Sequence, residues 1–185
     1  MKQILQNFRS GETSIEECPA PSIKKNSLKI LTRKSLISAG TERMLVNFSK
    51  SSYFEKAKQQ PEKVKQVINK ISTDGILTTY DSVKSKLDEP IALGYSNVGV
   101  IDELPEGITD FKVGDRVVSN GPHADLVVVN KNLCAIIPDN VDDDAAAFTV
   151  VGSIALQGLR LSNPNIGENY VVFGVGLIGL ITVQL

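Results

Sequence analysis

The 185-residue chain has no tryptophan, one histidine and two cysteines, and aromatic residues make up only 5% of it. Two cysteines are too few for a disulfide framework or a four-cysteine zinc site, which favours a reduced, cytoplasmic setting. The 20 basic and 21 acidic side chains leave a net charge of -1, so no overall field attracts nucleic acid or an anionic membrane. The longest apolar stretch, residues 170–185, is interrupted by glycines and is shorter than the roughly 20 residues of a bilayer span. We therefore expect neither nucleic acid nor a membrane as a partner.

The part of the chain before about residue 139 reads as mostly β, because short β-branched runs alternate there with Gly, Pro, Asn and Asp. The predicted strands cover residues 28–38, 98–104, 116–119, 126–129 and 133–137. A helix is predicted after these strands, where Asp142 to Asp144 precede three alanines, and the apolar pattern of this helix continues to Arg160.

One helical insert, residues 50–74, interrupts the β pattern. Val64, Val67, Ile68 and Ile71 recur at helical spacing, and Pro61 suits a first helical turn. Five lysines give the insert a basic face: Lys56, Lys58, Lys63, Lys65 and Lys70. This face is either the solvated side of the helix or a docking surface for an acidic partner or substrate.

A glycine motif follows an apolar run at the end of the chain. Residues 170–173 are suited to a central parallel strand, and Gly174, Val175, Gly176, Leu177, Ile178 and Gly179 then read as G-x-G-x-x-G. In such a motif the glycines permit a tight turn, close approach of a diphosphate, and close packing of the following helix. The N–H groups at that helix start then hold the phosphates. An ordinary glycine-rich β-α turn is the alternative.

The order of several motifs resembles the medium-chain dehydrogenase/reductase superfamily. The matching segments are residues 38–42 (SAGTE), 94–100 (GYSNVGV), 111–117 (FKVGDRV), 132–141, 145–148 and the glycine motif. The resemblance is greatest to a zinc-less subgroup that includes the N-terminal halves of proteins fused to a Gfo/Idh/MocA-type oxidoreductase. It implies a mainly β fold with some α: a GroES-like, barrel-type substrate domain over residues 1–150, and over 151–185 a connecting helix and the first β-α unit of a truncated Rossmann domain.

The resemblance also implies a function. It predicts an NAD- or NADP-dependent oxidoreductase that transfers hydride to or from a small carbonyl, alcohol or activated alkene, with a sugar-related substrate among the options. The partners that the resemblance implies are a second copy of the chain, in a homo-oligomer, or a fused C-terminal oxidoreductase domain. Only residues 180–185 follow the last glycine, so we expect an N-terminal fragment that has no turnover by itself.

The metal ligands of zinc members are missing at the matching positions. Ala39 stands where such members have Cys, and Tyr95 and Ser96 stand where they have His and Glu, so we expect no zinc. A non-catalytic GroES-like binding or assembly module is therefore the alternative function.

Four side chains are candidates for a catalytic role, and each also has a structural interpretation. Thr41 matches the family's proton-relay hydroxyl, or else bonds the local backbone. Tyr95 is either a hydrogen-bond donor to a substrate oxygen or a half-buried packing residue whose hydroxyl contacts water. His123 is a general acid/base candidate but reads more readily as a turn residue. Cys134 reads as a small core residue rather than a nucleophile.

Overall fold

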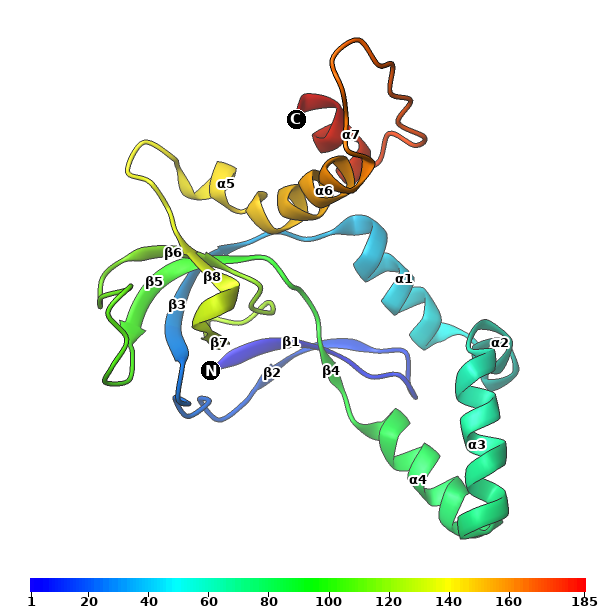
Figure 1. Cartoon of the computed structure of the whole chain (residues 1–185). Helices are drawn as coiled ribbons and strands as arrows, with labels where there is room; N and C mark the ends of the chain where they lie inside the picture. Colours follow the sequence, from blue (N-terminus) through cyan, green and yellow to red (C-terminus); the bar gives the residue numbers. More distant parts are fainter. The chain divides into compact units, whose positions relative to one another are not determined.

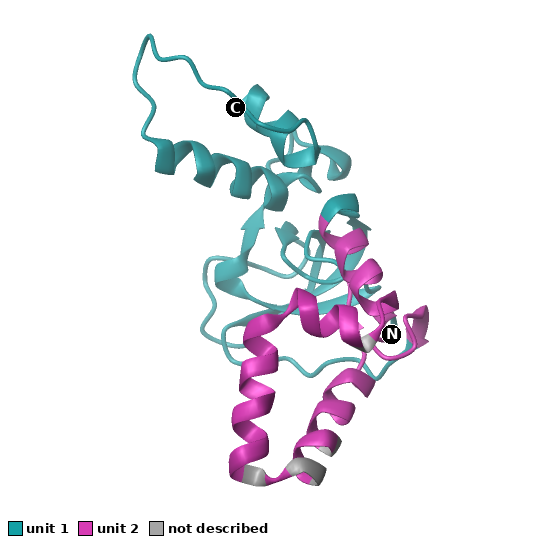
Figure 2. Ribbon diagram, turned by 90° about the vertical axis from the view of Figure 1, so that its right-hand side faces the viewer, with its two compact units in different colours: residues 1–3, 17–40, 94–185 teal, residues 4–16, 41–93 magenta. Residues whose placement is uncertain are grey.

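A computed structural model describes residues 1–52, 54–73, 75, 78–80 and 82–185. The chain forms two compact units, coloured separately in Figure 2. Unit 1 contains residues 1–3, 17–40 and 94–185, and unit 2 contains residues 4–16 and 41–93. Figure 1 labels the elements in chain order.

A five-stranded antiparallel sheet forms the centre of unit 1, with the order β7-β3-β5-β6-β8. Its strands are β3 (Ser27–Ser35), β5 (Asn97–Glu103), β6 (Arg116–Ser119), β7 (Leu126–Asn130) and β8 (Cys134–Ile136). One core cluster contains Ile108 and residues from four of these strands: Leu28, Ile30, Ile101, Val117, Val127 and Val129. A second cluster joins Val98 and Val118 to Ala146 and Ala147, so β5 and β6 are buried at successive positions. All five predicted strands are confirmed to within a few residues.

A smaller sheet has the order β2-β1-β4. It consists of β1 (Lys2–Gln6), β2 (Thr13–Glu17) and the two-residue β4 (Ile91–Ala92), where Leu5 pairs with Ala92 in antiparallel register. The buried Gln6 side chain joins this sheet to the first helix, because its Nε2 donates to Ser49 Oγ over 2.7 Å. The sequence patterns did not predict these strands.

The helical part of unit 2 is larger than predicted. In place of one helix within 50–74, four helices occupy residues 39–88: α1 (Ala39–Lys50), α2 (Tyr53–Gln59), α3 (Pro61–Asp74) and α4 (Ile76–Asp88). Ser52 separates the first two with a capping box, in which its hydroxyl accepts from the N–H of Glu55. The helix start at Pro61 is confirmed, and Gly75, with φ of 85°, ends α3. The single predicted helix was wrong in extent because α1 and α4 carry weaker apolar periodicity.

Asp142 starts the next helical segment as expected, since its carboxylate accepts from Ala145 N–H over 2.7 Å. The predicted continuous helix to Arg160 is nevertheless divided into α5 (Asp143–Ala146) and α6 (Thr149–Ser162). The interruption follows from the hydrogen bonds: Phe148 N–H donates three residues back to Ala145, and the Ala147 carbonyl accepts from the buried hydroxyl of Ser96. Asn163 ends α6 in the left-handed conformation.

Residues 170–173 do not form the predicted strand. Within the described part of the chain no segment pairs with them, and Val171 and Phe173 are 90% and 103% exposed. A parallel strand exists only through hydrogen bonds to a neighbouring strand, so an apolar run suited to such a strand stays irregular without one. The helix that follows, α7 (Leu177–Gln184), is formed as expected.

A salt-bridge network fastens α5 to the sheet of unit 1. Arg116 on β6 donates to Asp143 Oδ1 over 2.7 and 3.1 Å, and Arg33 Nε lies 3.3 Å from Asp143 Oδ2. The hydrogen bond from Arg116 holds the pKa of Asp143 below its ordinary value, with the charge of Arg33 acting in the same direction. The carboxylate is only 13% exposed, so this pair is more than a screened surface contact.

We expect Asp143→Asn to lower the free energy of unfolding by about 1 to 2 kcal/mol at neutral pH. Because the folded pKa is depressed, this contribution is present above the unfolded value near 4 and is lost as the pH falls through the folded pKa. Urea unfolding at pH 7, 4 and 3 should therefore show the two proteins converging in acid. The control is Asp144→Asn, whose carboxylate is 76% exposed beside Lys34 and should matter little. A gap that persists unchanged at pH 3 would contradict this assignment.

Candidate functional site

The glycine motif forms a tight turn in front of a helix. Gly174 has φ of 102°, a conformation that favours glycine, and Gly176 lies directly before α7 in an extended conformation. A Cβ on Gly179 would overlap the Gly174 carbonyl oxygen, whereas a Cβ on Gly176 would meet no atom within 4 Å. The space beside Gly176 is thus open, and the space beside Gly179 is filled by the turn itself.

This turn fits a diphosphate. No side chain caps α7, so the first N–H groups of the helix keep their capacity to bind an anion. Gly176 leaves room for the anion to approach the backbone, and the partial positive charge of the helix start favours it. The motif residues Val175, Leu177 and Ile178 contribute backbone rather than polar side chains.

Tyr95 and Ser96 lie in the short connection between β4 and β5, where Gly94 has φ of 93°. Tyr95 is half-buried, and Ser96 is buried with its hydroxyl donating to the Ala147 carbonyl over 2.6 Å. Ser96 therefore holds the junction between α5 and α6 in place. The Ser96 hydroxyl therefore makes a structural hydrogen bond at the position where zinc members have a metal-binding Glu.

His123 lies at a bend after β6, which agrees with the turn interpretation, and its burial was not predicted. Its Nδ1 lies 2.9 Å from the Ser35 hydroxyl, and only 5% of the residue is exposed. The ring packs on the backbone of Gly94, where a Cβ would come within 2.6 Å of the ring. His123 thus supports the connection that carries Tyr95.

A group of polar residues around this end of the sheet, of which Asn97 and Ser119 are buried, was missed by sequence reasoning. Ser35, Asn97 and Ser119 are opposite one another on β3, β5 and β6, and Asn97 is fully buried. Its Nδ2 donates to Thr32 Oγ1 over 2.8 Å, while its Oδ1 has no hydrogen-bond partner among the described atoms. The available signal was a polar residue inside, just before or at the end of three predicted strands: Ser35 within 28–38, Asn97 before 98–104 and Ser119 at the end of 116–119.

Thr41 and Ala39 lie in the first turn of α1, and both are exposed. The neighbouring Glu42 is the buried member of this segment, at 7% exposure. Thr41 belongs to unit 2 and Tyr95 to unit 1.

Cys134 lies on β8, half-buried against the core as expected. Burial raises the pKa of its thiol to about 11. The thiol is therefore protonated at neutral pH, and a nucleophilic role is disfavoured.

Two searches of the described residues bear on metals and membranes. Within them, no three or more His, Cys, Asp or Glu side chains cluster as a metal site would require. In that same part of the chain, no helix combines the length and apolar character needed to cross a membrane.

The chain has clear relatives among curated proteins, although no model of a known protein family matches it. It is 26% identical over 122 residues to (R,R)-butanediol dehydrogenase of Bacillus subtilis, a match that covers 51% of the chain and 35% of that protein. It is 34% identical over 96 residues to D-guloside 3-dehydrogenase of Escherichia coli, covering 50% of the chain and 27% of that protein. The chain thus spans about a third of the length of these relatives.

Solved structures show the same fold over the whole chain. Galactitol-1-phosphate dehydrogenase of E. coli superposes with a TM-score of 0.70 at 18% identity, covering 100% of the chain and 51% of that protein. An E. coli alcohol dehydrogenase solved with NADH gives a TM-score of 0.70 at 20% identity, covering 100% of the chain and 52% of that protein. The relatives and neighbours include alcohol and polyol dehydrogenases and quinone oxidoreductases. The expected fold class is confirmed: a GroES-like domain with a curled sheet, followed by a partial Rossmann unit.

Proposed function

We propose that the protein carrying this chain is an NAD(P)-dependent, zinc-independent oxidoreductase. It transfers hydride between a nicotinamide and a small carbonyl, alcohol or activated alkene, with sugar-related compounds among the candidates. The observation that supports this most directly is the turn at Gly174 to Gly179, open beside Gly176 and placed before an uncapped helix. Neighbouring structures solved with NADH and with NADPH support the same class of cofactor.

In this proposal the chain's own residues bind and orient. The backbone of residues 174–179 holds the diphosphate, and the sheet of unit 1 supports the connection that presents Tyr95. The bound nicotinamide supplies the hydride chemistry. Thr41 or Tyr95 is the proposed hydroxyl donor to the substrate oxygen on which negative charge develops. The chain spans about half of the solved neighbours, so we expect the 185-residue polypeptide alone to show no turnover.

Zinc independence rests on the donor set at the matching positions. Methyl, phenol and hydroxyl groups of Ala39, Tyr95 and Ser96 are poor zinc ligands beside thiolate, imidazole and carboxylate. The Ser96 hydroxyl is further occupied by its bond to Ala147. The replacement of the zinc ligands by Ala39, Tyr95 and Ser96 also favours the second candidate function, a non-catalytic GroES-like binding or assembly module.

One experiment separates the two functions. The full-length protein is titrated with NADH and NADPH, assayed against alcohols, polyols, ketones, enones and quinones, and analysed for bound zinc. Saturable cofactor binding with turnover and less than stoichiometric zinc is the expected result. Absence of any nicotinamide binding would leave only the module, and stoichiometric zinc required for turnover would overturn zinc independence.

We expect one of the two variants, Tyr95→Phe or Thr41→Val, to lower kcat by about 10²-fold, because it removes the donor to developing charge. The affinity for NAD(P)H should stay unchanged in both. Tyr170→Phe is the matched control, since that exposed phenol bonds only to Glu168 and Ser162 in the described chain. A variant that keeps the wild-type kcat removes its residue from the proposed donors.

A further inference from the structure

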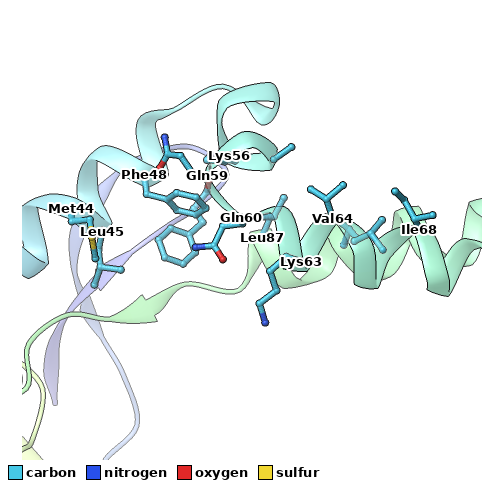
Figure 3. Close-up of a pocket in the computed structure, with 14 residues that line it drawn as sticks. Met44, Leu45, Phe48, Lys56, Gln59, Gln60, Lys63, Val64, Ile68 and Leu87 are labelled. Atoms are coloured by element: carbon cyan, nitrogen blue, oxygen red, sulfur yellow. Dashed lines mark hydrogen bonds between the residues drawn. The ribbon is translucent and has the colours of Figure 1, made fainter.

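Unit 2 contains a groove of about 880 Å³. Helices α1 to α4 and the turn after β1 contribute its walls. Figure 3 shows Met44, Leu45 and Phe48 from α1 on one wall, and Val64 and Ile68 from α3 on another. Most of the lining is apolar, as in small-molecule sites, which are largely apolar with a few polar groups.

The walls are held together by contacts that need no ligand. The rings of Phe8 and Phe48 meet edge to face, with centroids 5.6 Å apart. Lys56 on α2 is buried, and its ammonium donates to the carbonyls of Phe8 over 2.6 Å and Ser49 over 2.7 Å. Burial lowers the pKa of Lys56. These bonds connect α2 to α1 and to the turn after β1, so the groove is part of the folded unit.

The size of the groove indicates a small molecule rather than a protein. Small-molecule pockets enclose roughly 300 to 1,000 Å³, and this groove lies within that range. A stable protein interface takes about 20 to 30 residues from each partner. Among the residues that the structure describes, 14 line this groove.

The charges around the groove indicate an anionic head group. Lys63 on α3 lines it, is exposed, and takes part in none of the ion pairs of the described side chains. Lys65 on the same helix does not line the groove and lies 3.4 Å from Glu62. Among the described lining residues none is acidic, and Gln59 and Gln60 add amide donors.

We propose that this groove binds a single anionic amphiphile, with an apolar chain against Phe48, Val64 and Ile68 and a carboxylate or phosphate head at Lys63. The site is independent of the hydride transfer proposed above. Each further methylene of the chain buries more apolar surface, so affinity should rise about fourfold per methylene until the groove is full.

Isothermal titration calorimetry with the 185-residue chain tests this, using decanoate and dodecanoate below their micellar concentrations. Calorimetry is suitable because the chain has no tryptophan to report binding. We expect saturable binding of one molecule per chain, tighter for dodecanoate. Lys63→Glu should weaken it at least tenfold, whereas the control Lys65→Glu on the same helix should stay within twofold of wild type.

A neutral probe separates head from tail. Lys63→Glu should leave the binding of dodecyl maltoside unchanged, and Ile68→Gln should weaken both probes because it alters the apolar wall at an exposed position. Thermal unfolding of each variant verifies the fold. If Lys63→Glu and Lys65→Glu lose the same affinity for dodecanoate, the attraction is non-specific and the proposal is overturned. Binding to phosphatidylglycerol vesicles without binding of free dodecanoate would overturn it in favour of a membrane surface.

Discussion

Replacing Gly99 with alanine is expected to lower the free energy of unfolding by about 3 kcal/mol, a large part of the roughly 5 to 15 kcal/mol that keeps a typical domain folded. Gly99 lies in the central strand β5, paired with Thr32 on β3 and Val117 on β6. An added Cβ would overlap the Leu31 carbonyl oxygen and come within 2.6 Å of Ile30 Cγ2. Because β5 is hydrogen-bonded on both sides, the strand cannot move away without breaking one of its ladders.

Urea unfolding followed by circular dichroism measures this effect, with soluble expression as a second readout. Gly158→Ala is the matched control, because Gly158 lies in α6 and a Cβ there meets no atom within 4 Å. That variant should gain about 0.5 to 1 kcal/mol from the higher helix propensity of alanine. A Gly99→Ala protein that unfolds at the wild-type urea concentration would show that β3 and β5 do not approach as closely as described.

The strands of unit 1 were predictable because their signal is local. β-branched residues between turn-forming residues locate β6 at residues 116–119 and β5 within one residue of its observed bounds. The sequence pattern of a half-buried strand repeats every two residues, and Val127 and Val129 on β7 follow it, whereas β6 is buried at three successive positions, residues 117–119. The capping role of Asp142 was predictable for the same reason, since it concerns residues only three apart.

The elements that were missed depend on partners elsewhere in the chain. Residues 170–173 have the composition of a buried strand, yet none of the described segments pairs with them, and composition alone does not reveal this. The division between α5 and α6 involves Ser96, 51 residues from the carbonyl it binds. Helices α1 and α4 needed packing within unit 2 to be recognised, because their own periodicity is weak.

The candidate site also has one part that the sequence predicted and another that required the structure. The turn at residues 174–179 was expected from spacing alone, and the positive φ of Gly174 and the filled space beside Gly179 agree with it. The burial of His123 against Gly94 and Ser35 required the structure, since these residues are distant in sequence. Local backbone geometry is thus readable from a motif, whereas the support of Tyr95 by a buried histidine is not.

Two single substitutions in the glycine turn should have separable effects on NAD(P)H binding by the full-length protein. Gly176→Ala adds a Cβ into open space at φ of -73°, so the fold should keep its stability to within about 0.5 kcal/mol. The same Cβ occupies the approach of the diphosphate, so affinity should fall at least tenfold.

Gly179→Ala should cost more than 100-fold in NAD(P)H affinity, because its Cβ overlaps the Gly174 carbonyl and forces the turn and the start of α7 apart. Misplacing the backbone removes several phosphate contacts together, whereas the Cβ of Gly176→Ala obstructs one. Fluorescence titration with NADH and NADPH, alongside thermal unfolding of both variants, measures the difference. If Gly176→Ala binds both cofactors as tightly as the wild type, the diphosphate does not lie against this turn, and the open space beside Gly176 has another purpose.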